Sequence, residues 1–187
     1  MKGKTLKRRA FQLGVSLFVC ILAIFMGTML HSQVCNAKEK NMCGKNAEWE
    51  YTQETKTLSI KGTGEIILDD DWRELEIVNI TIGEGITKIG DNAFCNCAKV
   101  NKVEIPSTVT EIGNFSFASC KKLKDIKLPT SLKRIGWGAF ESCKKLIKIE
   151  IPNSVTVIGA NAFRNCKALK SVKLSTQMKE ISSGMFD

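Results

Sequence analysis

The chain has 187 residues, of which 43% are hydrophobic and 25% are charged, so it is long enough to bury a substantial core. The formal net charge is +9, but residues 1–37 hold five Lys and Arg and no acidic residue. The 23 Lys and Arg that follow stand against 19 Asp and Glu, a net charge of +4 that is a weak argument for nucleic-acid binding.

The N-terminus has the three parts of a secretory signal. Basic residues between Lys2 and Arg9 precede an uncharged, largely apolar stretch over 10–30, and Cys35-Asn36-Ala37 forms a small-x-small cleavage site. The apolar stretch is also just long enough to span a bilayer, so residues 1–37 are either cleaved or kept as an N-terminal membrane anchor. Both outcomes predict that the rest of the chain is secreted or at the cell surface, with membrane contact only through an uncleaved segment.

A period of 23 residues dominates the chain after residue 80. The motif Ile-Gly-x-x-Ala-Phe recurs without insertion, with Ser116 in place of alanine in the second copy, and a degenerate fifth copy ends at Phe186. An isoleucine, a phenylalanine, a proline and a cysteine all follow the period: Ile89, Ile112, Ile135, Ile158 and Ile181; Phe94, Phe117, Phe140, Phe163 and Phe186; Pro106, Pro129 and Pro152; Cys97, Cys120, Cys143 and Cys166. One such unit cannot bury its apolar face alone, so the pattern predicts stacked coils with like residues in columns.

Alternation within one repeat predicts a short strand in each coil. Ile126 and Leu128 point inward and Lys127 outward, and Pro129 ends the strand because it cannot donate to a continuing sheet. Gly136 then permits a tight turn. The fold class that follows is a β-rich leucine-rich repeat solenoid with 23-residue repeats and about 4.5 turns.

Residues 43–68 differ from the repeats. The segments 49–51 and 57–60 alternate around a turn at 52–56, which predicts a β-hairpin that caps the first coil, with Trp49 and Trp72 buried. The expected organisation is a signal peptide or anchor over 1–37, a capping hairpin and linker over 38–76, and the solenoid over 77–187.

The repeated unit L-x-x-I-x-L-P-x-x-L-x-x-I-G-x-x-A-F-x-x-C, over about 77–187, resembles the BspA-type leucine-rich repeat of bacterial surface proteins. The segment from Cys43 to Glu65 also resembles the hairpin that precedes such arrays. The resemblance implies a secreted or surface-attached protein, and adhesion to host matrix proteins or other cells.

The residue types argue against an enzyme. His31 is the one histidine and lies at the end of the export segment, so a cleaved chain has no Ser-His-Asp or Cys-His system. No cofactor or metal site is expected: Cys95-Asn96-Cys97 lacks a second ligand pair, and Asp69-Asp70-Asp71 lacks calcium-loop spacing. The repeat cysteines are expected to be small buried residues, with one disulfide, Cys43–Cys95, left open.

Three sets of exposed residues are candidates for partner binding. The outward strand positions form columns of alternating sign, which predicts ion pairs between neighbouring strands and argues against a basic nucleic-acid groove. A lysine stripe suits an anionic glycan or an acidic protein. Trp137 replaces Asp91, Asn114 and Ala160 of the other repeats, so its ring is expected to be exposed. The candidate residues are Lys102, Glu104, Asp125, Lys127, Lys148 and Glu150 on the strands, Lys121, Lys122, Lys144 and Lys145 in the stripe, and Trp137.

The expected function is adhesion, through binding of an extracellular protein or an anionic glycan and not of nucleic acid. One alternative is a structural or assembly module, or a truncated fragment of a larger surface adhesin. An uncovered C-terminal coil would also permit a homodimer through its open edge.

Overall fold

The computed structural model describes residues 41–67, 72, 74–178 and 181–187, all of which belong to the unit Glu39–Asp187. The predicted export segment 1–37 and the aspartate run 69–71 lie outside the described residues. Within the described part, no helix is long and apolar enough to cross a membrane. Eleven strands are present there: β1 Asn41–Met42, β2 Asn46–Thr52, β3 Thr57–Ile66, β4 Asn79–Ile82, β5 Ile86–Ile89, β6 Lys102–Glu104, β7 Glu111–Ile112, β8 Arg134–Ile135, β9 Lys148–Glu150, β10 Val157–Ile158 and β11 Ser171–Lys173.

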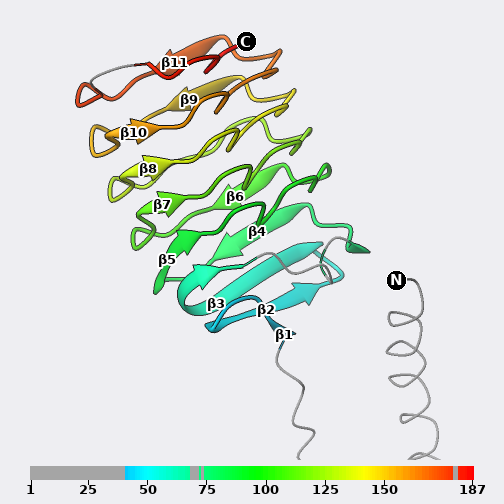
Figure 1. The fold of residues 1–187 in the computed structure, drawn as a ribbon. Coiled ribbons are helices and arrows are strands. Elements are labelled where there is room, and N and C mark those ends of the chain that lie inside the picture. The colour runs from blue at the N-terminus through cyan, green and yellow to red at the C-terminus, as the bar shows by residue number, and fades with distance from the viewer. Residues whose placement is uncertain (1–40, 68–71, 73, 179–180) are drawn as a thin grey trace, which may run out of the picture. The chain divides into compact units, whose positions relative to one another are not determined.

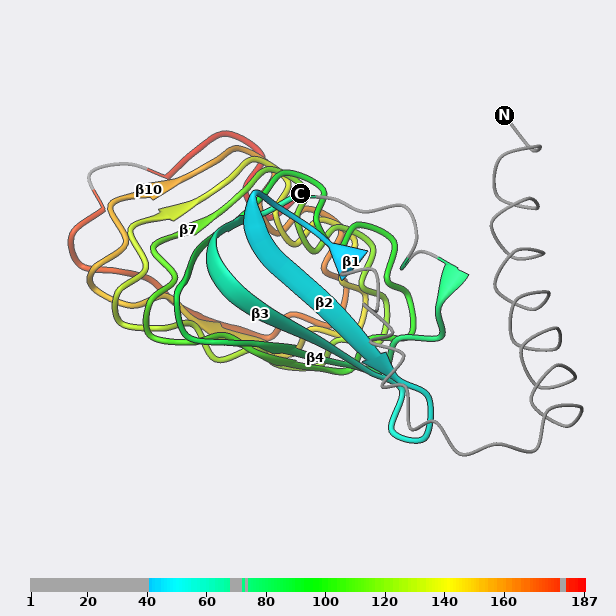
Figure 2. The same cartoon turned by 90° about the horizontal axis from the view of Figure 1, so that it is seen from below.

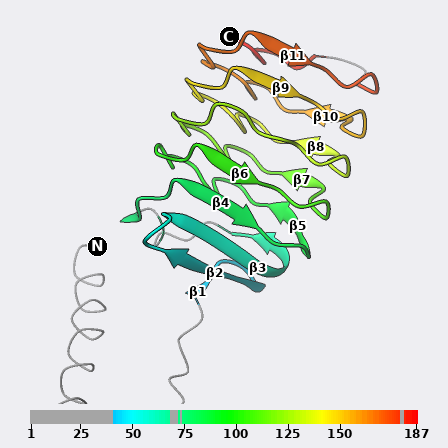
Figure 3. The ribbon, with the colours of Figure 1, turned by 180° about the vertical axis from the view of Figure 1, so that it is seen from behind.

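The strands after β3 belong to stacked coils (Figure 1). Strands β4, β6, β9 and β11 lie on one side of the coils, and β5, β7, β8 and β10 lie on another (Figures 1 and 3). Neighbours pair in parallel with partners 23 residues apart, as between Arg134 of β8 and Val157 of β10. The predicted solenoid of 23-residue repeats is therefore confirmed, with about five coils.

The hairpin of β2 and β3 closes the first coil (Figure 2). Strand β3 pairs antiparallel with β2 on one edge, and on its other edge with two strands in turn. Its first half pairs with β4 and its second half with β5, with a bulge between Gly64 and Glu65. Gly62 has a φ of 104°, and a Cβ there would lie 2.1 Å from the Asn46 carbonyl oxygen, so only glycine fits this bend.

A column of aromatic rings runs through the core. Trp72 stacks on Phe94 at 5.6 Å between ring centroids, and each phenylalanine of the repeat stacks on the next at 5.3 to 5.8 Å. Trp72 is fully buried, as predicted, whereas Trp49 is only partly buried and packs edge-on against it. Burying a ring of this size stabilises the fold by about 1.5–3 kcal/mol, so the column is a main source of stability.

The predicted columns weaken at the last described coil. Phe140 and Ile135 are fully buried, but Phe186 is 45% exposed and Ile181 is 62% exposed. Both occupy the repeat positions that the period assigns to them, and Phe186 still stacks on Phe163. Burial in a solenoid depends on the coils on both sides, and no further coil covers these two side chains in the described residues.

Candidate partner-binding surfaces

The sheet face consists of the outward side chains of β4, β6, the segment 124–128, β9 and β11. Lys102 and Glu104 are exposed on either side of the buried Val103, and Lys148 and Glu150 flank the buried Ile149 in the same way. Asp125 and Lys127 are also exposed, while Ile126 and Leu128 are buried. The predicted division into inward and outward positions is therefore confirmed for all three coils.

The predicted continuous strand pairing is wrong at the third coil. Segment 124–128 is not a strand, so β6 pairs only with β4, and β9 only with β11. Within the described residues, no backbone hydrogen bond involves the N–H or C=O groups of Asp125, Ile126, Lys127 and Leu128. The sheet is interrupted on this side of the solenoid.

The predicted ion pairs between neighbouring strands of the sheet face are also wrong. Among the sheet-face charges of the described residues, the one ion pair joins Lys102 Nζ to Glu104 Oε1 at 2.7 Å, and both belong to β6. Lys127 and Glu150 were expected to attract each other at the usual strand spacing of about 4.8 Å. Neither forms an ion pair among the described residues, and neither do Glu150 and Lys173, although these two lie in register on the paired strands β9 and β11.

Two open grooves flank this segment. One, of about 530 Å³, lies between it and β6, and is lined by Val103, Ile105 and Ser107 on the β6 side. The other, of about 580 Å³, lies toward β9, with Ile149, Glu150 and Asn153 among its lining residues. Both grooves combine apolar walls with charged groups, a composition typical of binding sites.

The lysine edge is a set of five exposed lysines in the turns that follow the repeat cysteines: Lys121, Lys122, Lys144, Lys145 and Lys167. In each turn the N–H of a buried or half-buried leucine donates to the cysteine carbonyl, as from Leu123 to Cys120 at 3.1 Å and from Leu146 to Cys143 at 3.0 Å. The two residues between the cysteine and the leucine lie at the tip of the turn. The structure thus places all four predicted stripe lysines on one edge.

Three of the four repeat cysteines are buried, as the sequence predicts, whereas Cys97 is only partly buried. Cys120 and Cys143 are fully buried, and burial raises the pKa of each thiol well above its usual range. Burial also raises the pKa of Cys166 to about 11. The buried repeat cysteines Cys120, Cys143 and Cys166 are thiols, and the Cys43–Cys95 disulfide left open by the sequence stays open. No group of three or more His, Cys, Asp and Glu gathers around a metal position among the described residues.

Trp137 and Phe115 form an aromatic corner on neighbouring coils. The Trp137 ring is 46% exposed, as predicted, and meets Phe115 at 4.7 Å between centroids and 63° between planes. With the Asn161 amide oxygen turned toward the indole, Trp137 Nε1–H donates to it at 3.1 Å. Phe115 has a φ of 51°, a conformation that is unfavourable for a bulky side chain. The indole is therefore held in one position by the coils before and after it.

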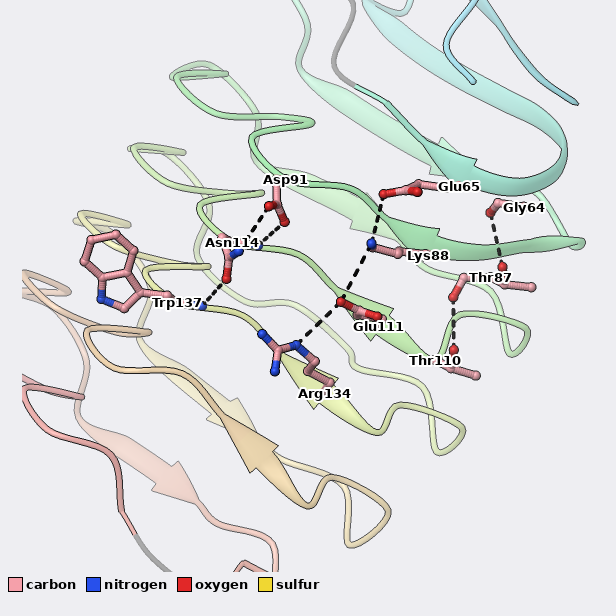
Figure 4. A network of polar contacts seen from close by, with 10 residues as sticks. All are labelled: Gly64, Glu65, Thr87, Lys88, Asp91, Thr110, Glu111, Asn114, Arg134 and Trp137. Carbon is pink, nitrogen blue, oxygen red and sulfur yellow. Dashed lines mark hydrogen bonds and ion pairs between the residues drawn. The ribbon is translucent and has the colours of Figure 1, made fainter. Parts of the chain in front are cut away.

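A polar network that the sequence reasoning missed lies beside this corner (Figure 4). Lys88 Nζ contacts Glu65 at 3.0 Å and Glu111 at 3.9 Å, and Glu111 also contacts Arg134 at 3.5 Å. These four residues are spaced 23 residues apart and their charges alternate in sign, so an alignment of the repeats could have predicted the ion pairs. The charges on this side neutralise one another from coil to coil.

A second series of contacts crosses the coils next to these ion pairs. The Asn114 backbone N–H donates to Asp91 Oδ1 at 2.8 Å, and the Trp137 backbone N–H donates to Asn114 Oδ1 at 2.8 Å (Figure 4). The amide and carboxylate oxygens thereby satisfy backbone donors of the following coil. On this side of the solenoid, the polar side chains therefore hold neighbouring coils together.

Together, the 23-residue coils, the parallel strands and the aromatic column define a leucine-rich repeat solenoid. The chain belongs to the BspA-type leucine-rich repeat family, because the model described as "BspA type Leucine rich repeat region (6 copies)" matches residues 65–187. A search of curated proteins gave no match.

Solved structures of other leucine-rich repeat proteins are similar. One from Bacteroides ovatus is 28% identical, with 79% of this chain and 44% of that chain covered and a TM-score of 0.59. One from Eubacterium ventriosum is 25% identical, with 74% and 44% covered and a TM-score of 0.57. The leucine-rich repeat protein of T. pallidum, 24% identical with 79% and 86% covered and a TM-score of 0.50, shares the fold. The chain spans 44% of the length of each of the first two.

Proposed function

We propose that this protein is a secreted or cell-surface binding module, without catalytic activity, that takes an extracellular polypeptide on its sheet face. Membership of the BspA-type family and the secretory features of residues 1–37 support the extracytoplasmic location. The repeat geometry supports a binding role, since stacked coils present extended surfaces that single domains of this size lack.

The observation that carries the proposal is the interruption of the sheet. The backbone groups of 125–128 lie between two grooves and make no backbone hydrogen bond with either neighbouring coil in the described residues. An extended polypeptide supplies complementary N–H and C=O groups and alternating side chains, as in strand addition to other sheets. The unpaired charges Asp125, Lys127 and Glu150 would then fix its register.

The test is saturable binding of the purified protein to immobilised matrix proteins and mucins at physiological salt. The charge-reversal variant K127E/K148E changes both grooves, and K45E/K133E makes the same charge change at exposed positions elsewhere. We expect K127E/K148E to weaken binding at least about tenfold, or about 1.4 kcal/mol, and K45E/K133E to leave it unchanged. Absence of binding by the folded protein would favour an assembly module, and equal weakening by the two variants would remove the sheet face from the account.

A further inference from the structure

Four turns on one edge of the solenoid share the same construction. In each, the N–H of the residue after the tip donates to a repeat-cysteine carbonyl at 2.9 to 3.1 Å, beginning with Val100 to Cys97 and ending with Leu169 to Cys166. The ends of the turns pack into the core, and the two central residues point away from it. Because the turns are 23 residues apart and the coils stack, their central residues form two columns parallel to the solenoid axis.

These columns are mainly cationic and have no acidic counterpart. The five lysines of the lysine edge occupy five of the six central positions of the last three turns, and Ala168 occupies the sixth. None of the five lysines forms an ion pair in the described residues. Lys99 in the first turn differs from these five lysines, because it donates a hydrogen bond to the Glu76 carboxylate. Hydrogen bonds and charge from Lys56 and Lys99 lower the pKa of Glu76 to about 2. The later turns therefore present a local row of lysines without an ion-pair partner among the described residues.

The turns that carry the lysines are also fixed in position. The Cys143 thiol donates to the Phe117 carbonyl oxygen at 3.2 Å, and the Cys166 thiol to the Phe140 carbonyl oxygen at 3.1 Å. Each bond joins a lysine turn to the preceding coil through the core. The spacing between coils, about 4.8 Å for parallel strands, then sets the spacing of the cations along the edge.

We propose that the lysine edge binds a linear acidic polysaccharide, which runs along the solenoid axis and places its carboxylate or sulfate groups against successive turns. A row of evenly spaced cations matches a polymer with repeated anionic groups better than it matches a compact anion. Nucleic acid fits less well, since the central turn positions carry no aromatic side chain for base stacking and no arginine for bidentate phosphate contacts. This inference goes beyond the sheet-face function and uses none of its residues.

The test measures binding of the purified protein to heparin, a sulfated chain, and to polygalacturonate, a carboxylated one, over a series of salt concentrations. The variant K121Q/K122Q/K144Q/K145Q removes four edge charges. The control K45Q/K61Q/K133Q/R134Q removes four exposed charges outside both proposed binding surfaces, so the two variants have the same net charge. Thermal unfolding of both confirms that the fold is retained, as expected for exposed turn and surface positions.

We expect the edge variant to lose at least about tenfold in affinity and to show a shallower dependence of log K on log salt, because fewer counterions are released. The control should keep its affinity within about twofold. Binding of one polymer and not the other would support the proposal and identify the anionic group. The proposal is overturned by equal losses in the two variants, by tighter binding to duplex DNA than to either polysaccharide, or by no binding of the unmodified protein at low salt.

Discussion

The thiol of Cys143 donates a hydrogen bond to the carbonyl oxygen of Phe117, which belongs to the preceding coil, at 3.2 Å. Cys120 and Cys166 make the same contact with Phe94 and Phe140. The Phe117 carbonyl also accepts from the Cys120 backbone N–H at 3.2 Å, so the thiol is its second donor, and such a hydrogen bond contributes about 0.5–1.5 kcal/mol. The repeat cysteine is therefore a connection between coils as well as a small core residue.

Replacing Cys143 by alanine should destabilise the protein by about 1–2 kcal/mol, because the Phe117 carbonyl loses the second of its two donors and a small cavity remains. Urea unfolding followed by circular dichroism measures this difference. The variant C95A is the control, since Cys95 is only partly buried and should tolerate the change with a smaller loss. Equal losses at both positions would mean that the thiol contact is not what stabilises the coil.

The raised pKa of the repeat thiols predicts a loss of stability at alkaline pH. Cys166 has a pKa of about 11 in the folded protein, whereas an unfolded thiol ionises near its ordinary value of about 8.5. Above that value the unfolded chain releases its proton first, so the stabilisation is complete below about pH 8.5 and is lost as pH rises toward 11. Urea unfolding at a series of pH values measures the trend.

The control for this pH dependence is the triple variant C120A/C143A/C166A, which retains the lysines and Tyr51 that titrate in the same range. Its stability should fall less steeply between pH 8.5 and 11 than that of the unmodified protein. Identical slopes would show that the thiols do not contribute. Slow alkylation of these three thiols in the folded protein at pH 8 gives an independent check.

Position along the aromatic column should determine the effect of removing a ring. Phe140 is fully buried between Phe117 and Phe163, with centroids at 5.5 and 5.6 Å. Phe140→Ala should cost about 3–5 kcal/mol. Phe186→Ala removes the same ring where it is 45% exposed, and should cost roughly 1 kcal/mol. Thermal or urea unfolding distinguishes the two, and similar losses would contradict the assignment of the core.

The aromatic corner makes Gly138 and Phe115 dependent on each other. Gly138 has a φ of 56°, and a Cβ there would lie 2.4 Å from Phe115 Cε1. Gly138→Ala should cost about 2–3 kcal/mol, from the left-handed backbone and from the displaced ring. The double variant F115N/G138A should cost less than the two single variants combined, because asparagine removes the ring and suits the left-handed conformation. Additive losses in urea unfolding would exclude the contact.

Much of this fold is predictable because one coil repeats another. The 23-residue period places Phe94 over Phe117 without information beyond the sequence, and alternation separates Lys127 from Ile126 correctly. The same alignment contained the alternating charges of Lys88 and Glu111, which the reasoning did not follow across the coils. The exposure of Trp137 was predicted because this residue departs from the repeat, whereas its contact with Phe115 was not predicted.

The interrupted sheet was not predictable, for a physical reason. Ile126 and Leu128 alternate with Lys127 in the same way as their equivalents in paired strands, so the local pattern is identical. Whether backbone groups meet across coils depends on the path of three coils together. Column membership also does not determine burial, as the exposure of Ile181 shows.

Hydrogen exchange of the backbone amides, with and without a bound polypeptide from the matrix-protein and mucin panel, tests the sheet-face account most directly. In the unbound protein, the amides of 125–128 should exchange faster than that of Ile151, which donates to Lys173. Bound polypeptide should slow the exchange of 125–128 while the amides of β7 and β8 keep their rates. Protection confined to β7 and β8, or slow exchange of 125–128 in the unbound protein, would contradict the account.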